Sequence, residues 1–356
     1  MNLCIYDPHP TCGGPGTTSM HLPWPTITST FSGKRVKSMS PRRLQQNGTH
    51  FYGGDLTVVK HSELVDALRR YDGVVLAEPR QPHMDKLALK GKCAQPRYLE
   101  ALRDCSTPFT VQLHALPMYS SKKSPWLRRL LALPNFTGRG VSFYEKVEGA
   151  GDNQTLFDQL DWIHSPLPYS GPFGDLHSRG GSAVMTGRVV PAKDHARFVR
   201  AAGMRREIWG AAGVGMHECL THKLMSLASR VEGADATEVP DHYEPHEWEV
   251  GDVRYCGAFS DCTRPLNGAA LHVSLTRPSL SFGITEWCSL EAMAHRIPTI
   301  RCKCHSSGPY QGAVVDDDDD LAAAMIAARE DDFDDQRLVR QWNDPVRCVR
   351  AHERCF

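Results

Sequence analysis

Short apolar segments alternate with segments of helical periodicity along this chain, and this alternation limits the fold more than any other feature. Residues 73–77 (GVVLA) form a continuous apolar run after a helical pattern at 63–71, and residues 109–113 (FTVQL) follow a second helical pattern at 96–104. Strands that are apolar on both faces are typical of parallel sheets covered by helices. The first half is therefore predicted to be a doubly wound α/β domain.

The same alternation returns in the second half, after an irregular segment at 162–181 that is rich in proline and glycine and predicts an interdomain linker. Strands are predicted there at 183–186, 207–209, 253–255, 271–275, 299–301 and 313–315, and helices at 194–202, 289–295 and 321–329. The length of 356 residues fits two domains. We expect an N-terminal domain at 1–168, a second domain at 169–335 and a C-terminal segment, 336–356, that returns to the first domain.

Composition narrows the class of protein. The 41% hydrophobic and 23% charged residues are typical of a globular protein, and no apolar run reaches the roughly 18–20 residues of a membrane span. The start, Met1 to Tyr6, indicates a buried strand and lacks the features of a secretory signal, so we expect a cytoplasmic protein. The twelve cysteines are scattered, which favours reduced, buried thiols.

Two segments carry residue types suited to a phosphorylated ligand. Gly187 and Arg188 follow the strand predicted at 183–186, and Lys193 lies five positions after Arg188, so one loop offers two cations to a diphosphate. A helix predicted near 289 follows a polar loop and carries Glu291 in its first turn. Such a helix start attracts phosphates, and a carboxylate there can accept hydrogen bonds from ribose hydroxyls. A helix that merely packs on the sheet explains the second pattern equally well.

Together these segments resemble the glycosyltransferases built from two facing Rossmann-like domains with parallel sheets, the GT-B class, and in particular the large retaining family 4. Those enzymes open the second domain with a strand and a Gly-Arg loop that ends in Lys, and they close it with a Pro-Ser, loop, Leu-Glu-Ala-Met-Ala, Pro signature. The matching residues here are Gly187, Arg188, Lys193, Pro278, Ser279, Leu290-Glu291-Ala292-Met293-Ala294 and Pro298. The resemblance implies that Arg188 and Lys193 hold the diphosphate of a UDP- or GDP-linked sugar and that Glu291 binds its ribose.

In the first domain the resemblance is thinner. Gly13 and Gly14 lie where the family keeps a glycine-rich loop, and His114 lies where many members keep an active-site histidine. A histidine at a strand end is also a common structural residue.

One departure concerns the second-domain signature. The family carries a further glutamate eight positions before Glu291, at the place of Gly283, and Glu286 is the candidate to replace it beside the donor sugar. Thr285, which precedes Glu286, is a further candidate for donor binding.

No metal or other cofactor is expected to be required, since cations and helix starts can offset the charge of a leaving diphosphate. Cys302, Cys304 and His305 (CKCH) have the chemistry of zinc ligands, but no companion pair stands at a recognisable spacing to complete a four-ligand site. The five aspartates at 316–320 precede a predicted helix and are expected to cap it rather than to bind a metal.

The sequence does not identify the acceptor of the sugar. The net charge is zero, which argues against a general attraction to nucleic acid, yet the first domain has two basic clusters near aromatic residues: Lys34, Arg35, Lys37, Arg42 and Arg43, then Lys122, Lys123, Arg128 and Arg129. They are compatible with a polyanionic acceptor such as DNA with a hydroxymethylated base, as in viral enzymes that glucosylate their own genomes. A sugar, lipid or small-molecule hydroxyl is the broader expectation. The alternatives to a transferase are a sugar-nucleotide-binding protein without activity and an epimerase or phosphorylase on the same fold.

Overall fold

A computed structural model of the chain describes residues 1–8, 21–30, 54–77, 97–113, 126–148, 151–210, 216–238, 247–259, 261, 263–276, 285–331 and 333–356. The chain forms two compact units: unit 1 comprises Met1–Ser170 and Asn343–Phe356, and unit 2 comprises Gly171–Trp342. The chain returns from unit 2 to unit 1 at Asn343, which is later than the predicted start of the returning segment at 336. The reason is that helix α12 (Asp335–Trp342) packs against α10 (Trp287–Ala294), where Gln336 donates a 2.7 Å hydrogen bond to the carbonyl of Ala294.

The sheet of unit 1 has, within the described residues, seven parallel strands in the order β3-β2-β1-β4-β5-β6-β7. The strands are β1 (Leu3–Tyr6), β2 (Thr26–Thr30), β3 (Leu56–Lys60), β4 (Gly73–Ala77), β5 (Phe109–Leu113), β6 (Phe136–Ser142) and β7 (Asp161–His164). The helices are α3 (Leu64–Leu68), α4 (Arg97–Cys105), α5 (Leu127–Leu131), α6 (Gln154–Phe157) and α13 (Pro345–Glu353), with 3-10 turns η1 (His61–Glu63) and η3 (Gly151–Asn153).

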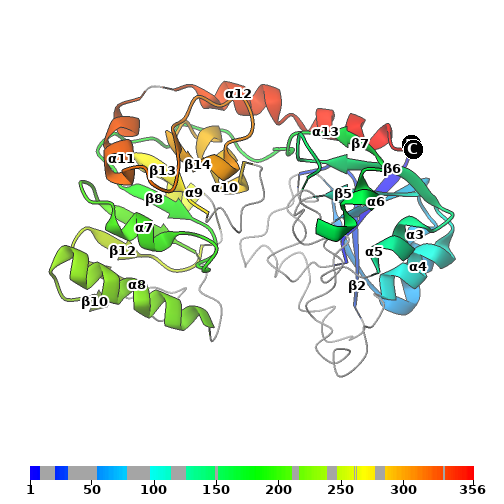
Figure 1. Ribbon diagram of the computed structural model, residues 1–356, viewed down its shortest axis with the longest axis horizontal. Coiled ribbons are helices and arrows are strands. Elements are labelled where there is room, and N and C mark those ends of the chain that lie inside the picture. The colour runs from blue at the N-terminus through cyan, green and yellow to red at the C-terminus, as the bar shows by residue number, and fades with distance from the viewer. Residues whose placement is uncertain are drawn as a thin grey trace. The chain divides into compact units, whose positions relative to one another are not determined.

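The C-terminal segment completes unit 1. Helix α13 packs against β6 and β7, as the red helix in Figure 1 shows. The ring of Phe356 lies against Gly73 at the start of β4, and the side chain of Arg139 donates a 2.9 Å hydrogen bond to the carbonyl of Arg354. The last residues of the chain thus contact strands that formed from its first half.

The sheet of unit 2 has, within the described residues, eight strands in the order β10-β11-β12-β9-β8-β13-β14-β15. The strands β12, β9, β8, β13, β14 and β15 run parallel to one another. The strands β10 and β11 at one edge are antiparallel. The strands are β8 (Ala183–Thr186), β9 (Arg206–Trp209), β10 (Thr237–Glu238), β11 (Trp248–Val250), β12 (Val253–Tyr255), β13 (Leu271–Ser274), β14 (Thr299–Cys302) and β15 (Val314–Val315).

Helices of unit 2 cover this sheet (Figure 1) and bury its central strands β8, β13 and β14 along their whole length. Besides α10 and α12, they are α7 (His195–Arg200), α8 (Met216–Glu232), α9 (Thr263–Leu266) and α11 (Leu321–Glu330), with the 3-10 turn η5 (Lys303–His305). Asp320 caps α11, since its side chain accepts hydrogen bonds from the amides of Ala322 and Ala323. The capping role predicted for this acidic run is thus confirmed at Asp320.

Two further expectations can be compared with the structure. The predicted linker began at 162, but Trp162 and Ile163 belong to strand β7, so the irregular connection starts after His164. The eight cysteines whose side chains are described are free thiols, and most of them are buried. Among the described residues there is also no helix with the length and apolar character that crossing a membrane requires.

Several residues selected from the sequence lie outside the described residues. They are Gly13, Gly14, His114, Pro278, Ser279, Gly283 and the basic residues Lys34, Arg35, Lys37, Arg42, Arg43, Lys122 and Lys123.

Candidate functional site

The candidate site lies at the carboxyl ends of the central strands of unit 2. Strand β8 pairs with β9 on one side and with β13 on the other, and the chain reaches β13 only after it has built β9 to β12. In open α/β sheets, ligands bind beyond the carboxyl ends of the strands at the point where the strand order reverses in this way. The loops that follow β8 and β13 carry Lys193 and Glu286 to this point.

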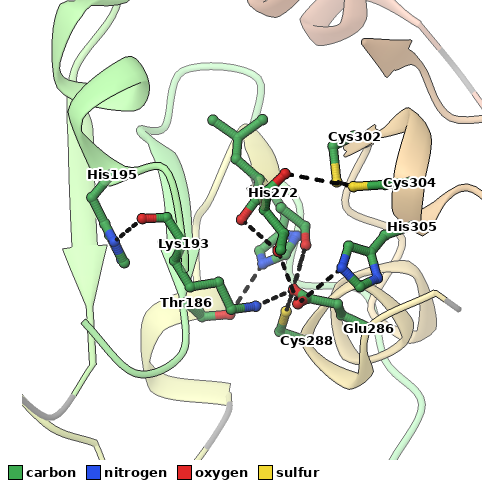
Figure 2. A network of polar contacts seen from close by, with 12 residues as sticks. Thr186, Lys193, His195, His272, Glu286, Cys288, Cys302, Cys304 and His305 are labelled. Atoms are coloured by element: carbon green, nitrogen blue, oxygen red, sulfur yellow. Dashed lines mark hydrogen bonds and ion pairs between the residues drawn. The ribbon is translucent and has the colours of Figure 1, made fainter. Parts of the chain in front are cut away.

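Glu286 is the centre of a polar cluster (Figure 2), which we call the Glu286 network: Lys193, Ser274, Thr276, Glu286, Cys288 and His305. Lys193 forms an ion pair and hydrogen bond with Oε2 of Glu286. The hydroxyl of Ser274 donates to the same oxygen over 2.7 Å, and the hydroxyl of Thr276 donates to Oε1 over 3.3 Å. Nε2 of His305, after β14, lies 3.8 Å from Oε1, so one carboxylate gathers groups from the end of β13 and from the loops after β8, β13 and β14.

The backbone of Glu286 begins helix α10. Its carbonyl accepts hydrogen bonds from the amides of Ser289 and Leu290, over 3.0 and 3.2 Å, while its side chain turns to Lys193 and does not cap the helix. The first amides of α10 thus keep the partial positive charge of an uncapped helix start beside the ion pair.

Charges within the network balance. Burial would by itself raise the pKa of the Glu286 carboxyl, but the charge of Lys193 outweighs burial and holds that pKa well below its usual range. Burial likewise opposes the charge of Lys193, and Glu286 outweighs it, so the pKa of Lys193 is raised. Both groups are charged at neutral pH, and their sum is zero. Burial raises the pKa of the Cys288 thiol to about 12, so this thiol stays protonated and donates to Glu286 over 3.4 Å.

Two buried histidines flank the network in Figure 2 and remain neutral. Burial lowers the pKa of His195 to about 4, and its Nδ1 lies 3.1 Å from the carbonyl oxygen of Lys193. Burial lowers the pKa of His272, on β13, to about 3, and its Nε2 lies 3.0 Å from the hydroxyl of Thr186 at the end of β8. His195 thus contacts the loop after β8, and His272 joins β13 to β8. Neither imidazole adds a charge to the network.

Arg188 lies on the same loop as Lys193 but has a different environment. It is exposed and forms no hydrogen bond or ion pair with any residue that the structure describes. Gly187, which precedes it, has a φ of +120°, and its carbonyl oxygen would lie 1.6 Å from a Cβ placed on Gly210 after β9. The approach leaves no room for a side chain at Gly210, and the positive φ favours glycine at position 187.

Glu291 is partly buried on α10, but the prediction that it lies in the first turn is wrong, because α10 begins at Trp287 rather than near 289 and Glu291 is its fifth residue. Within the described part of the chain its carboxylate forms no hydrogen bond or ion pair. Burial, with a smaller contribution from the charge of Asp261, raises the pKa of Glu291 to about 7. Perturbed carboxyls of this kind concentrate at functional sites, because a ligand can supply the hydrogen bonds that the protein withholds.

Thr285 has a supporting position. Its hydroxyl donates to the carbonyls of His305 and Ser307, and its amide donates to the Ser307 hydroxyl over 3.0 Å. These bonds join the loop after β14 to the start of α10. The Thr285 side chain is therefore engaged within the protein, and it fixes Glu286 in place.

The residues predicted from the sequence thus fall into separate environments. Lys193 and Glu286 meet, Thr285 supports them, Glu291 lies further along α10, and Arg188 is exposed on its loop.

Sequence reasoning missed Ser274, Thr276 and Cys288, and it considered His305 only as a zinc ligand. Ser274 ends β13, Thr276 follows β13 and His305 follows β14, so the strand-end rule applied to every predicted strand would have pointed to them. The side chains of Cys302, Cys304 and His305 also come together, with their ligand atoms within 4.8 Å of one another.

The topology of both units defines the class of fold: two Rossmann-like α/β units, each built on a largely parallel sheet. Solved structures with this arrangement match along nearly the whole chain, and they identify it as the GT-B fold. HepE of Anabaena, solved with UDP-glucose, is 13% identical with a TM-score of 0.62, and the match covers 99% of this chain and 97% of HepE.

Two other matches are similar in extent. An α-glucosyltransferase solved with UDP-glucose and DNA containing an abasic site is 11% identical with a TM-score of 0.61, covering 98% of this chain and 97% of that one. A glycosyltransferase of Rickettsia africae is 10% identical with a TM-score of 0.56, covering 99% and 98%. No protein-family model and no curated protein sequence matches the chain.

Proposed function

We propose that the chain is a glycosyltransferase that moves a sugar from a nucleoside-diphosphate sugar to an acceptor hydroxyl. This proposal rests on one observation. Lys193, Glu286 and the start of α10 lie together at the point where the strand order of the second sheet reverses. The GT-B neighbours solved with UDP or UDP-glucose support a nucleotide sugar as the donor.

In this proposal each part of the site contacts one part of the donor. Arg188, the first amides of α10 and Lys193 bind the diphosphate, and Glu291 accepts hydrogen bonds from the ribose. The diphosphate competes with Glu286 for Lys193. Glu286 then accepts hydrogen bonds from hydroxyls of the donor sugar and takes the role of the family glutamate whose place Gly283 occupies.

The reaction that follows retains the configuration of the sugar, as in family 4. The acceptor oxygen attacks the anomeric carbon on the face from which the diphosphate leaves, the bond from that carbon to the diphosphate oxygen breaks, and the acceptor proton passes to the diphosphate. Fixed cations and helix amides stabilise the leaving group electrostatically, so the reaction requires no metal.

A panel of UDP- and GDP-linked sugars tests the donor proposal. We expect one nucleotide type to raise the melting temperature of the protein and its sugar to be hydrolysed slowly, with release of free nucleotide, in the presence of a chelator. A ligand at one hundred times its Kd stabilises the folded state by about 2.7 kcal/mol, which such a melting experiment detects. If no nucleotide shifts the melting temperature, the protein does not bind the donor as proposed.

Arg188 offers a sharp variant because it has no partner in the described part of the protein. Arg188→Ala is expected to leave the melting temperature of the free protein unchanged and to weaken nucleotide binding by about tenfold or more, since a hydrogen bond to a charged group contributes about 1.5–3 kcal/mol. Arg230→Ala, which removes an exposed arginine of α8 in the same unit, is the matched control and should bind like the wild type. Equal affinities for all three proteins would contradict this diphosphate site.

A second candidate function, supported by the α-glucosyltransferase neighbour that is solved with DNA, is sugar transfer to a hydroxymethylated base of DNA. A gel shift with duplex DNA at 50 and 200 mM salt tests it, because phosphate contacts weaken steeply over this range. Binding at low salt that falls with salt, followed by sugar transfer to DNA with hydroxymethylated bases, would support it. If the protein does not bind DNA even at low salt, an ordinary hydroxyl acceptor is favoured.

A further inference from the structure

A cluster of soft metal ligands lies beside the Glu286 network. Cys302 ends strand β14, and the 3-10 turn η5 that follows brings Cys304 and His305 back towards it. The three ligand atoms lie within 4.8 Å of one another, and the two sulfur atoms are 3.0 Å apart. Four ligands at bond lengths of about 2.0–2.3 Å around a tetrahedral zinc ion stand about 3.5–3.8 Å from each other. The cluster therefore needs movements of only about 1 Å to surround an ion.

Its burial and charge also suit a metal ion. Cys302 and His305 are buried, and Cys304 is partly buried. A divalent cation with two thiolates and a neutral imidazole has no net charge, and neither does the Lys193–Glu286 pair next to it. Such a neutral unit avoids most of the cost of burying ions.

The surroundings of the cluster supply a carboxylate. Oε1 of Glu286 lies 3.8 Å from Nε2 of His305, and Figure 2 shows the two side chains pointing toward each other. Histidines that bind metals commonly have a carboxylate beside the imidazole, which orients the ring and raises its basicity. Lys303, between the two cysteines, points away and pairs with Asp316 over 2.9 Å, so its charge does not oppose a cation.

From this geometry we propose that Cys302, Cys304 and His305 bind one zinc ion, with Glu286 as the carboxylate that orients His305. Two thiolates and an imidazole select a soft or borderline cation such as Zn²⁺ rather than Mg²⁺ or Ca²⁺. Three protein ligands leave a fourth position of the tetrahedron open to a water molecule. This site shares Glu286 with the reaction proposed above, but the zinc ion takes no part in that reaction, and the test of the site does not depend on nucleotide binding.

Cobalt and zinc titrations of the reduced, chelator-treated full-length protein test the site. Co²⁺ should produce a near-ultraviolet thiolate-to-metal absorption band at one equivalent per chain, and Zn²⁺ should abolish the band at the same stoichiometry. Cys302→Ser, Cys304→Ser and His305→Gln should each weaken zinc binding by about tenfold or more. Cys256→Ser, which alters a buried thiol elsewhere in unit 2, is the control and should keep the band.

Alkylation of the unaltered protein gives a readout that does not require the variants to fold. Zn²⁺ should slow the alkylation of Cys302 and Cys304, mapped by mass spectrometry, and leave the rate at Cys256 unchanged. Absence of the band, or equal alkylation of Cys302 and Cys304 with and without Zn²⁺, would overturn the proposal. A band that persists in all three ligand variants would overturn it as well.

Discussion

The raised pKa of Glu291 predicts that replacing this buried carboxyl stabilises the protein, whereas most substitutions destabilise it. A carboxyl whose pKa is raised in the folded protein binds its proton more tightly there than in the unfolded chain. The resulting loss of stability is absent below the unfolded pKa, grows as the pH rises from about 4.5 to about 7, and is constant above. Glu291→Gln removes this penalty, so we expect the variant to be more stable than the wild type at pH 8.

The magnitude follows from the two pKa values. A difference between 4.5 and about 7 corresponds to at most about 3 kcal/mol at pH 8 and to less than about 1 kcal/mol at pH 5. Glu291 is partly exposed, which reduces the effect, and we expect about 1–2 kcal/mol at pH 8. For a unit of this size each kcal/mol shifts the melting temperature by about 2–4 °C. The transition of unit 2 should therefore rise by roughly 2–8 °C at pH 8.

The assay is thermal melting of the wild type, Glu291→Gln and Glu330→Gln at pH 5 and pH 8. Glu330 is an exposed carboxylate at the end of α11, and its removal should have a small effect that does not depend on pH. The same stabilised Glu291→Gln variant should bind the nucleotide about tenfold or more weakly if Glu291 accepts ribose hydrogen bonds. A melting difference that is equal at both pH values, or a loss of stability at pH 8, would refute the argument from burial.

Three further predictions concern the fold. Lys193→Met leaves the Glu286 carboxylate buried without its cation and should lower the stability of unit 2 by roughly 2–4 kcal/mol in thermal melting, whereas the double variant with Glu286→Gln should recover at least half of this loss. Gly210→Ala places a Cβ 1.6 Å from a main-chain oxygen and should greatly reduce the yield of folded protein, whereas Gly180→Ala, which meets no atom within 4 Å, should be tolerated. A chain that ends before Asn343 should keep unit 2 resistant to limited proteolysis and lose that resistance in unit 1, because α13 is part of unit 1; equal resistance of both units would contradict this.

Three of the strands that the sequence predicted correctly have only buried residues. The bounds 73–77, 109–113 and 183–186 agree with β4, β5 and β8, because a strand covered on both faces needs an unbroken buried run. Strand β2 was missed because it buries Thr26 and Thr28, which have no apolar signature. Strand β6 was missed because it contains glycines, and at Gly140 the absent side chain makes room for the ring of Trp162.

At the candidate site, the sequence indicated candidate residues but not which side chains they contact. Lys193 and Glu286 lie 93 residues apart, and their ion pair depends on β8 lying beside β13, which no local pattern reveals. Spacing also could not show that Arg188 and Lys193, on one loop, have different environments. That difference depends on side-chain direction after Gly187, whose φ of +120° turns the chain.

The return of the C-terminus to unit 1 has a consequence for synthesis of the protein. Multidomain chains usually fold from the N-terminus as they leave the ribosome. Here unit 2 is continuous and can fold as soon as Trp342 has emerged, whereas unit 1 waits for its last fourteen residues, Asn343–Phe356. Unit 1 is thus completed last, because the contacts of α13 with β6 and β7 form only when this helix arrives. The nascent chain would carry an unfinished unit at the end made first, which is where chaperones would be expected to bind.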